Sequence, residues 1–514
     1  MPLPSQTFPG GLTRIEWAVF VVLTGGALTL ILGSPWLPMN DASSHIATSV
    51  ILRDFLRGDA FTTEHYAFGW APLPYWMPTL LQEPLLSVAS PRVAFALVVA
   101  LYALGLPWAL LQLLRFAAPE NAFLALFGSL AIFNTAYWLG EVGYLLGQPL
   151  MLIAYAVFLR IETFRSRSLY GFAALAVAVY LSHVFALVAL LGAVGVMVLV
   201  RGRSPYRLVP AQLAAVGWTA ALFGLAAWLI VVAHGTQANS GEMTFDYSLF
   251  HFGLIVTYPL DIPAPRGAGP SLAFVVLAFG LLLAPTVEGL LRRREKLSVH
   301  VNLPIALPAA ALAAVALFGP SGIKEAYSFE DIAQRFTLPA LLFAVGAVRF
   351  TGTPRRRLII VSAIFAFGLF RLALAWRVHD DYQETADHVA TELLDRIPEQ
   401  SRVLPLMDID RPNGSVWRVH RFANYVVPLR HGYSPHVFAR TGQQALRHAY
   451  FGDYRRVEDL AVSASEWAFY DYVLVQSDRE VPHVPGLLTH CALVAAVDGF
   501  RLYRTSHPAS HAAP

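Results

Sequence analysis

Eleven apolar runs, each reaching or approaching the length of a membrane-spanning helix, constrain this chain more than any other feature. A helix that crosses a bilayer needs about 20 mostly apolar residues. The runs cover residues 17–32, 93–114, 122–138, 144–159, 169–181, 184–200, 208–233, 272–291, 303–318, 336–348 and 358–374. Only 14% of the 514 residues are charged, whereas a soluble domain is about 25% charged. We therefore expect a polytopic α-helical membrane protein with about eleven transmembrane helices.

Basic residues gather between these runs in four short segments, at 160–167, 201–207, 292–296 and 349–357. When the runs are threaded alternately through a membrane, all four segments fall on one side, which the positive-inside rule assigns to the cytoplasm. This threading requires Ser182 and His183 to form a tight outer turn. It places the N-terminus in the cytoplasm, and it places Glu141, Arg335 and the whole segment after Trp376 on the outer face.

The composition changes after Arg377, where charge rises, apolar runs shorten and turn residues become frequent. Helical spacing predicts a helix at 385–397, and short apolar segments predict strands at 403–406, 472–475 and 500–503. We therefore expect a transmembrane domain at 1–376, with a long first outer loop at 33–92, followed by a small extracytoplasmic α/β domain at 377–505. The tail at 506–514 is expected to be disordered.

The sequence argues against a disulfide, a CxxC metal site and a nucleic-acid partner. The single cysteine, Cys491, excludes an intrachain disulfide and a CxxC metal site. The basic residues lie in short loops between apolar runs rather than in a continuous basic surface, which argues against a nucleic-acid partner.

Asp41 follows the first run directly and is positioned to cap a helix whose apolar residues Ile46, Val50 and Phe55 recur at helical spacing. We expect this helix to lie along the membrane surface with charged residues at 53–57 on its other face. His45 comes one turn after Asp41, so that the two side chains could share a proton or a divalent metal. The alternatives are a simple capping role for Asp41 and a packing or lipid-headgroup contact for His45.

His65 and Tyr66 form a second polar cluster in the same loop, together with Glu64. A stretch rich in proline, tryptophan and tyrosine follows at 70–78. Because tryptophan and tyrosine gather at membrane interfaces, we expect that stretch to be structural.

Two later outer loops carry further candidates. Glu141 lies between apolar runs, with Gln148 about two turns further on, and a carboxylate at such a place is costly to desolvate. It either faces a site at the membrane surface or is a solvated loop residue. Lys324 and Arg335 precede another run, where the planar guanidinium of an arginine suits a phosphate. Contact with lipid headgroups is the alternative for Arg335.

These features together resemble the GT-C superfamily of membrane glycosyltransferases. The matching features are Asp41 in MNDASSH after the first run, the amphipathic helix that follows, the acidic Glu141, Arg335 in AQRFTLPA, and a C-terminal outer domain. The Asp-x-x-x-His pattern, with HYAFGWAPLPYW downstream, is similar to a bacterial branch of that superfamily whose members are described as membrane proteins related to pyruvoyl-tetrahydropterin synthase.

The resemblance implies an enzyme of the bacterial plasma membrane. It would move a hexosyl or pentosyl group from a polyprenyl-phosphate donor to a lipid, glycan or protein acceptor on the outer face. Asp41 and Glu141 would be catalytic residues, and the substrate would contact His45, His65, Tyr66, Gln148, Lys324 and Arg335. The commonest family pattern has a second acidic residue beside Asp41, where this chain has Asn40 and Ala42. A divalent metal at Asp41 and His45 is therefore left open, and no other cofactor is implied.

Two other classes of function remain open. A transporter for lipid-linked glycans would be expected to show repeated halves and ionisable residues near the bilayer midplane, whereas the acidic residues here crowd the outer loops. A non-catalytic protein of cell-envelope assembly would use the C-terminal domain to bind a partner. Replacing Asp41 separates the enzyme from the non-catalytic protein, because only the enzyme would lose its function.

Overall fold

The chain forms two compact units in the computed structural model. Unit 1 gathers Met1–Ile31, Val99–Tyr137 and Glu141–Trp376, and unit 2 gathers Leu32–Val98, Trp138–Gly140 and Arg377–Pro514. The structure describes residues 11–70, 72–201, 210–234, 243–245, 248, 258–260, 301–323, 332–350, 353–408, 422–438, 446–448, 459–477 and 479–506.

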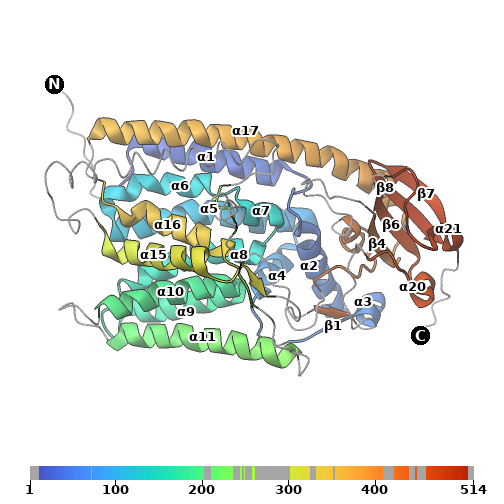
Figure 1. Cartoon of the computed structure of the whole chain (residues 1–514), viewed down its shortest axis with the longest axis horizontal. Helices are drawn as coiled ribbons and strands as arrows, with labels where there is room; N and C mark the ends of the chain where they lie inside the picture. Colours follow the sequence, from blue (N-terminus) through green and yellow to red (C-terminus); the bar gives the residue numbers. More distant parts are fainter. Residues whose placement is uncertain are drawn as a thin grey trace. The chain divides into compact units, whose positions relative to one another are not determined.

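Unit 1 is built from helices that pack as neighbours (Figure 1). The α-helices that lie wholly or mainly in it are α1 (Arg14–Gly33), α5 (Pro91–Ala117), α6 (Leu126–Leu130), α7 (Thr135–Leu139), α8 (Val142–Phe158), α9 (Arg167–Ser182), α10 (Val184–Arg201), α11 (Pro210–His234), α15 (Leu303–Phe318), α16 (Thr337–Ala347) and α17 (Pro354–Glu392). Two 3₁₀ helices, η1 (Pro119–Ala125) and η3 (Gln334–Phe336), and the short antiparallel strands β2 (Met243–Thr244) and β3 (Gly322–Ile323) complete its described elements.

Several helices are those of a multi-pass membrane protein. Among the described residues, five helical segments are long and apolar enough to cross a membrane: Arg14–Gly33, Pro91–Ala117, Pro119–Leu139, Pro210–Leu229 and Pro354–Arg396. Four shorter apolar helices, α8, α9, α10 and α15, accompany them. The predicted runs at 17–32, 93–114, 144–159, 169–181, 184–200 and 303–318 coincide closely with helices. The predicted run at 272–291 lies outside the described residues.

The predicted run at 122–138 lies in a segment long and apolar enough to cross a membrane, Pro119–Leu139, but the chain there is not one helix: it forms η1, α6 and α7 with a break after Leu130. Polar side chains satisfy the backbone groups at this break. Asn134 donates to the Ala131 carbonyl at 2.7 Å and accepts from the Tyr137 amide at 3.1 Å. Arg371 donates to the Leu130 carbonyl at 3.1 Å. A helix can break inside an apolar layer only where such partners replace the lost backbone hydrogen bonds.

The predicted helix at 385–397 is confirmed over most of its length, but it is the end of a longer helix and not the start of a new one. Helix α17 runs without interruption from Pro354 to Glu392, and the 3₁₀ helix η4 (Leu394–Arg396) follows it. No glycine or proline stands between Arg377 and Glu392, so nothing in that stretch breaks a helix. The rise in charge marks the end of the apolar part of this helix rather than the end of the helix.

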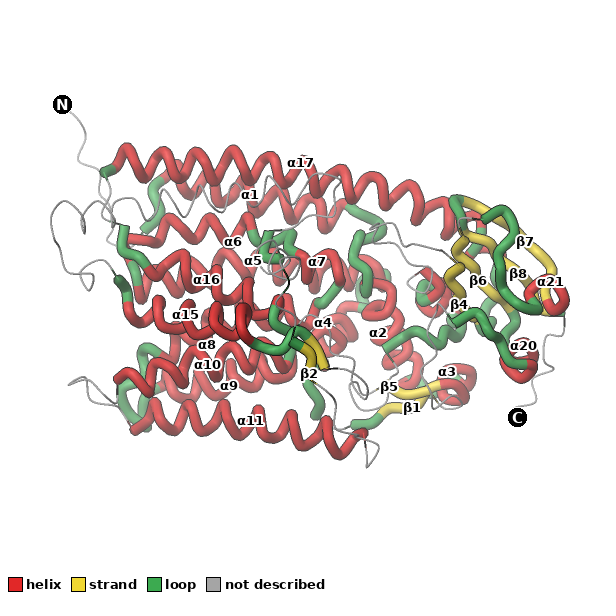
Figure 2. Tube along the Cα trace, in the orientation of Figure 1, coloured by secondary structure: helices red, strands yellow, loops and turns green. Residues whose placement is uncertain are grey.

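Unit 2 contains a four-stranded sheet, drawn in yellow in Figure 2. The strand order is β4 (Val403–Asp408), β6 (Tyr472–Ser477), β8 (Phe500–Thr505) and β7 (Cys491–Val497), with β4 parallel to β6 and the other pairs antiparallel. The three predicted strands are confirmed as β4, β6 and β8. The sequence did not predict β7, an edge strand whose side chains are mostly exposed and whose segment CALVAAV lacks a regular apolar alternation.

The remaining elements of unit 2 come from both ends of the chain. These are α2 (Ala42–Leu56), α3 (Ala60–His65), β1 (Tyr66–Phe68), α4 (Trp76–Leu85), α19 (Val426–Arg430), β5 (Leu446–His448), α20 (Ala464–Phe469) and α21 (Leu487–His490). Strand β1 pairs with β5 in antiparallel fashion, and α2 packs on α4 and α19. Unit 2 therefore joins the predicted first outer loop to residues after Trp376. The predicted domain ranges, 1–376 and 377–505, stay a prediction.

The charged face predicted for α2 is only partly open to solvent. Arg57 is exposed, whereas Asp54 is only 8% exposed and its carboxylate lies 2.9 Å from Nδ1 of His431. The apolar residues Ile46, Val50 and Ile51 are buried. Because α4 and α19 both pack on α2, most of this helix belongs to the core of unit 2. Its predicted position along the membrane surface stays a prediction.

Candidate functional site

Two of the predicted site residues form an ion pair in unit 1. Arg335 Nη2 lies 2.6 Å from Glu141 Oε1, although 193 residues separate them in the chain. Both side chains are largely buried, with exposed fractions of 16% and 11%. The second carboxylate oxygen of Glu141 accepts a hydrogen bond from the Tyr258 hydroxyl at 3.3 Å. The two charges therefore neutralise each other where water screens them less than at an open surface.

Three helices begin at this cluster. Glu141 is the N-terminal cap of α8, His183 stands directly before α10, and Arg335 lies in η3, directly before α16. The beginning of a helix carries a partial positive charge from its unpaired N–H groups. Together with the arginine, these helix ends make the cluster a favourable place for an anion. The term "α8–α10–α16 cluster" is used below for Glu141, His183, Tyr258 and Arg335.

His183 lies between the start of α10 and Arg335. Its Nδ1 lies 3.1 Å from the Phe185 amide, and its Nε2 lies 3.4 Å from Arg335 Nη1. Both neighbours are N–H donors, and a neutral imidazole accepts at only one of its nitrogens. Burial, and then the charge of Arg335, hold the pKa of His183 well below its usual range, so the ring is neutral.

Packing behind the cluster fixes its side chains. The Tyr144 hydroxyl donates to the Arg335 carbonyl, and the Tyr144 and His183 rings meet edge to face with centroids 5.5 Å apart. Gly147 lets the first turn of α10 approach α8, because a Cβ at this position would stand 2.6 Å from the Ala186 Cβ. A larger residue at Gly147 would therefore force α8 and α10 apart next to His183.

Gln148 lies one turn beyond Tyr144 on α8 and is fully buried. Its amide nitrogen and oxygen make no hydrogen bond with the residues that the structure describes. A buried amide in that state calls for a water or ligand partner. Its predicted contact with substrate stays a prediction.

Asp41 lies in unit 2, at the start of α2. Its amide donates to the Leu139 carbonyl at 3.1 Å and its carbonyl accepts from His45. The alternative role of Asp41 was a simple cap of this helix. Within the described part of α2, its carboxylate makes no capping hydrogen bond. Gly140 has φ of +82°, and a Cβ there would stand 2.5 Å from the Asp41 nitrogen. Glycine at 140 thus permits the close approach of Asp41 to the turn that precedes Glu141 in the chain.

His45 is held by a carbonyl and two rings. Its Nε2 donates to the Gly140 carbonyl at 3.1 Å, and its ring packs against Phe95 and Phe438, with centroid distances of 6.0 Å and 4.8 Å. This is the packing contact that the sequence left as an alternative. Among the described residues, no group of three or more His, Cys, Asp or Glu side chains is placed to hold a metal ion.

His65 and Tyr66 lie in a different part of unit 2. His65 Nδ1 donates to the Phe61 carbonyl at 2.8 Å, and its ring packs against Tyr433 with centroids 5.3 Å apart. Tyr66 is 2% exposed, and its hydroxyl donates to the Ser434 carbonyl at 3.3 Å. Both side chains are core residues here, and their predicted contact with substrate stays a prediction. Lys324 lies outside the described residues.

Sequence reasoning missed two members of the α8–α10–α16 cluster. His183 was considered only as part of a turn, yet a polar pair that interrupts two apolar runs is itself a signal for a functional position in a membrane protein. Tyr258 lies within a long stretch without periodic apolar residues, so no pattern singled it out.

Comparison with known proteins does not assign the chain to a family. No model of a protein family matches the chain, and no curated protein sequence matches it.

Proposed function

We propose that this chain is an integral membrane glycosyltransferase that uses a polyprenyl-phosphate sugar donor. The α8–α10–α16 cluster is the observation that carries the proposal. It combines an arginine, a buried neutral histidine and the positive ends of three helices among apolar helices. A phosphate attached to a lipid chain matches this combination, because the guanidinium N–H groups and the helix N-termini suit an anion and its chain suits the bilayer.

The donor phosphate would lie between Arg335 and His183. A phosphate oxygen there would accept from Nη1 of Arg335, which in the structure lies 3.4 Å from Nε2 of His183. Glu141 acts as a positioning residue in this arrangement, because its bond to Nη2 fixes the plane of the guanidinium. During transfer the bond between the sugar and the phosphate oxygen breaks, and the leaving phosphate gains charge. The guanidinium would stabilise that charge.

Asp41 is the catalytic base in this proposal. Its carboxylate would take the proton of the acceptor hydroxyl while the acceptor oxygen attacks the anomeric carbon, and the bonding electron pair would leave with the polyprenyl phosphate. The assignment rests on the sequence resemblance to GT-C enzymes.

The finer topology belongs to the proposal as well. About eleven transmembrane helices would place the N-terminus in the cytoplasm and residues after Trp376 on the outer face of a bacterial plasma membrane. The four basic segments at 160–167, 201–207, 292–296 and 349–357 support this orientation.

A transfer assay tests the proposal. Purified protein in nanodiscs is offered a panel of radiolabelled polyprenyl-phosphate sugars, and sugar release or transfer is measured for wild type, Asp41→Asn and Arg335→Lys. We expect turnover by the wild type, loss of turnover in Asp41→Asn, and a fall of about 100-fold in Arg335→Lys because lysine lacks the planar fork. Arg349→Lys is the matched control, since Arg349 also pairs with a glutamate, at 3.7 Å, but is half exposed.

Folded proteins that are all inactive across the panel would contradict the proposal and favour a non-catalytic role in envelope assembly. Turnover that survives Asp41→Asn would remove Asp41 from the mechanism.

A further inference from the structure

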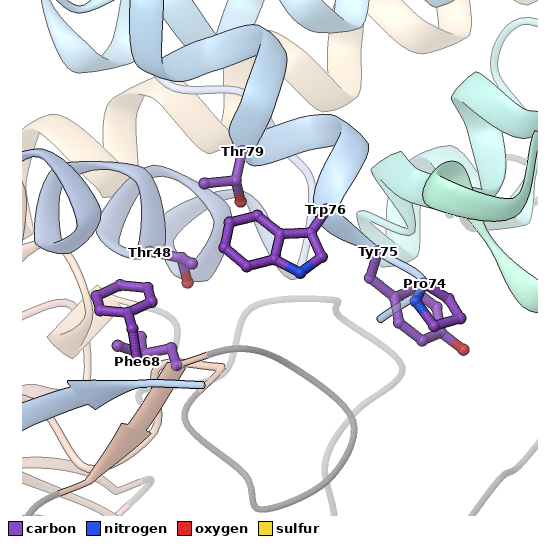
Figure 3. A pocket seen from close by; sticks show the side chains of 7 residues that line it. Thr48, Phe68, Pro74, Tyr75, Trp76 and Thr79 are labelled. Carbon is purple, nitrogen blue, oxygen red and sulfur yellow. The ribbon is translucent and has the colours of Figure 1, made fainter. Parts of the chain in front are cut away.

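Helix α4 in unit 2 turns its polar side toward the protein and its apolar side outward. Its buried residues are Pro78, Thr79 and Gln82. This buried side packs on α2, where Thr79 and Thr48 line the same small hollow (Figure 3). Apart from Glu83, the residues of α4 that stay partly or fully exposed are apolar: Trp76, Met77, Leu80, Leu81, Pro84 and Leu85. A helix at a surface in water shows the opposite arrangement.

The burial of Gln82 makes this arrangement costly in water. Gln82 is fully buried, and neither its amide nitrogen nor its amide oxygen makes a hydrogen bond within the described part of the chain. A buried amide without a partner costs free energy. Leu80, two positions before it, is 48% exposed. In water, a rotation of α4 that exposed Gln82 and buried Leu80 would be favoured on both counts, so the outward side of α4 suits an apolar medium.

The turn between α4 and α5 keeps its backbone groups bonded. The four amides of residues 86–89 donate to carbonyls at the end of α4, at 2.9–3.3 Å. The Ser87 hydroxyl donates to the Pro84 carbonyl at 2.7 Å. Val88, in the same turn, is 81% exposed. A backbone in contact with lipid needs such internal partners, because acyl chains offer no hydrogen bonds.

The outward apolar side continues into α5. Val93 and Leu97, at the start of α5 in unit 2, are 50% and 36% exposed. Leu101 and Leu104 follow on the same helix and are 53% and 49% exposed. Steps of three and four residues place these side chains on one side of α5, and α5 is long and apolar enough to cross a membrane. The exposed apolar residues of α4, the turn and α5 therefore follow one another along the chain.

We propose that α4 and the turn at 86–90 insert into the membrane, and that the acyl chains of one leaflet cover their apolar side. Helices of this kind lie at the boundary between headgroups and acyl chains, with the apolar side buried by about 5–10 Å. Trp70, which is 61% exposed and stacks on Trp76 with centroids 6.1 Å apart, suits the headgroup level. Unit 2 then contacts the membrane through α4 as well as through the start of α5.

Spin labels at single cysteines test the proposal. Cys491 is the only cysteine of the chain, so Cys491→Ala gives a background in which Leu80→Cys or Val88→Cys takes the label. The full chain is placed in phosphatidylcholine nanodiscs. Collisions of the label with oxygen, which concentrates among acyl chains, are compared with collisions with a nickel chelate that stays in water. Leu101→Cys is the matched lipid control, and Glu399→Cys, at an exposed residue, is the water control.

We expect the ratio of oxygen to nickel collisions at positions 80 and 88 to match the ratio at position 101 and to exceed the ratio at position 399 several-fold. A ratio like that at 399 would place α4 in water and overturn the proposal. Few collisions with either reagent would overturn it too, because protein, such as a second copy of the chain, would then cover this side. Leu80 lies in the helix and Val88 in the turn, so one label remains informative where the other prevents folding.

The proposal does not rest on glycosyl transfer. A lipid-like collision ratio in a protein that shows no turnover in the transfer assay would support the membrane contact of α4 and contradict the transferase. Turnover together with a water-like ratio would do the reverse.

Discussion

At the scale of single residues, the pairing of Glu141 with Arg335 has a stability consequence. When a partly buried charge loses its partner, it stays desolvated without the attraction that offset this cost. Removing one member of such a pair therefore destabilises the fold by more than the intact pair stabilises it. We expect Glu141→Gln to lower the free energy of unfolding by about 2–3 kcal/mol, measured as a thermal shift in detergent. Glu120→Gln breaks the more exposed pair with Arg349 and should cost less than about 1 kcal/mol. Equal shifts would mean that burial does not strengthen the Glu141 pair.

The His431–Asp54 pair predicts a pH effect in unit 2. The Asp54 hydrogen bond raises the pKa of His431 above 6.5. Burial acts to raise the pKa of Asp54, but His431 and Arg53 outweigh it and leave that pKa below 3.8. The His431 contribution is therefore complete below pH 6.5 and is lost as pH rises through its raised pKa. The Asp54 contribution is lost as pH falls through its lowered pKa.

Between these limits the pair stabilises the fold. Because His431 is nearly half exposed, the gain is below about 1 kcal/mol. We expect the wild type to lose thermal stability between pH 6 and pH 8.5 relative to His431→Gln, measured side by side in the same buffers. A constant difference between the two proteins across this range would exclude the pair as the cause.

The sequence indicated the right residue types at 141 and 335 because charged side chains beside apolar runs stand out. It could not indicate their contact, since 193 residues intervene and nothing local encodes it. His183 shows the same limit. Its place in a turn followed from the threading, but its contact with Arg335, 152 positions away in the chain, has no local signal.

At the scale of elements, the broken helix between α6 and α7 depends on α17. Arg371 is 2% exposed, and its guanidinium donates to the carbonyls of Leu130, Phe133 and Leu260. The sequence at 122–138 reads as one apolar run. The break in the helix could not be predicted from it, because the arginine that binds the freed carbonyls is far away in the chain. The strands β4, β6 and β8 were predictable because their apolar residues are bounded by turns, whereas the exposed edge strand β7 offers no such pattern.

Replacing Arg371 tests this dependence. Arg371→Met keeps much of the side-chain volume but leaves three buried carbonyls without their donor, each worth about 1–3 kcal/mol. We expect a loss of at least 3 kcal/mol in the free energy of unfolding, or failure to accumulate folded protein, measured by size-exclusion chromatography and thermal unfolding. Arg377→Met changes an exposed arginine of the same helix and should behave like wild type. A stable Arg371→Met protein would mean that the break does not need the arginine.

At the scale of the whole molecule, the division into two units predicts that each unit unfolds cooperatively. Unit 2 is held together by side chains from both ends of the chain, and Asn424 is the clearest of them. It is fully buried, and its amide donates to Ser44 at 2.8 Å and to the His436 carbonyl at 3.1 Å, while Ser434 donates to its oxygen at 2.6 Å. Composition placed Ser44 and Asn424 in different domains because it records local solvent preference and not such long-range hydrogen bonds.

We therefore expect Asn424→Leu, which removes all three hydrogen bonds at similar volume, to loosen unit 2 as one cooperative body. In hydrogen exchange, protection should fall together in α2 and in β4, although about 350 residues separate them, while α8, α10 and α16 keep their protection. Asn302 of unit 1, 4% exposed, donates to the Ala117 carbonyl, and Asn302→Leu should produce the opposite pattern. A loss confined to β4 would mean that the first loop folds independently of the C-terminal segment. A loss in both units at once would mean that the chain unfolds as a single body.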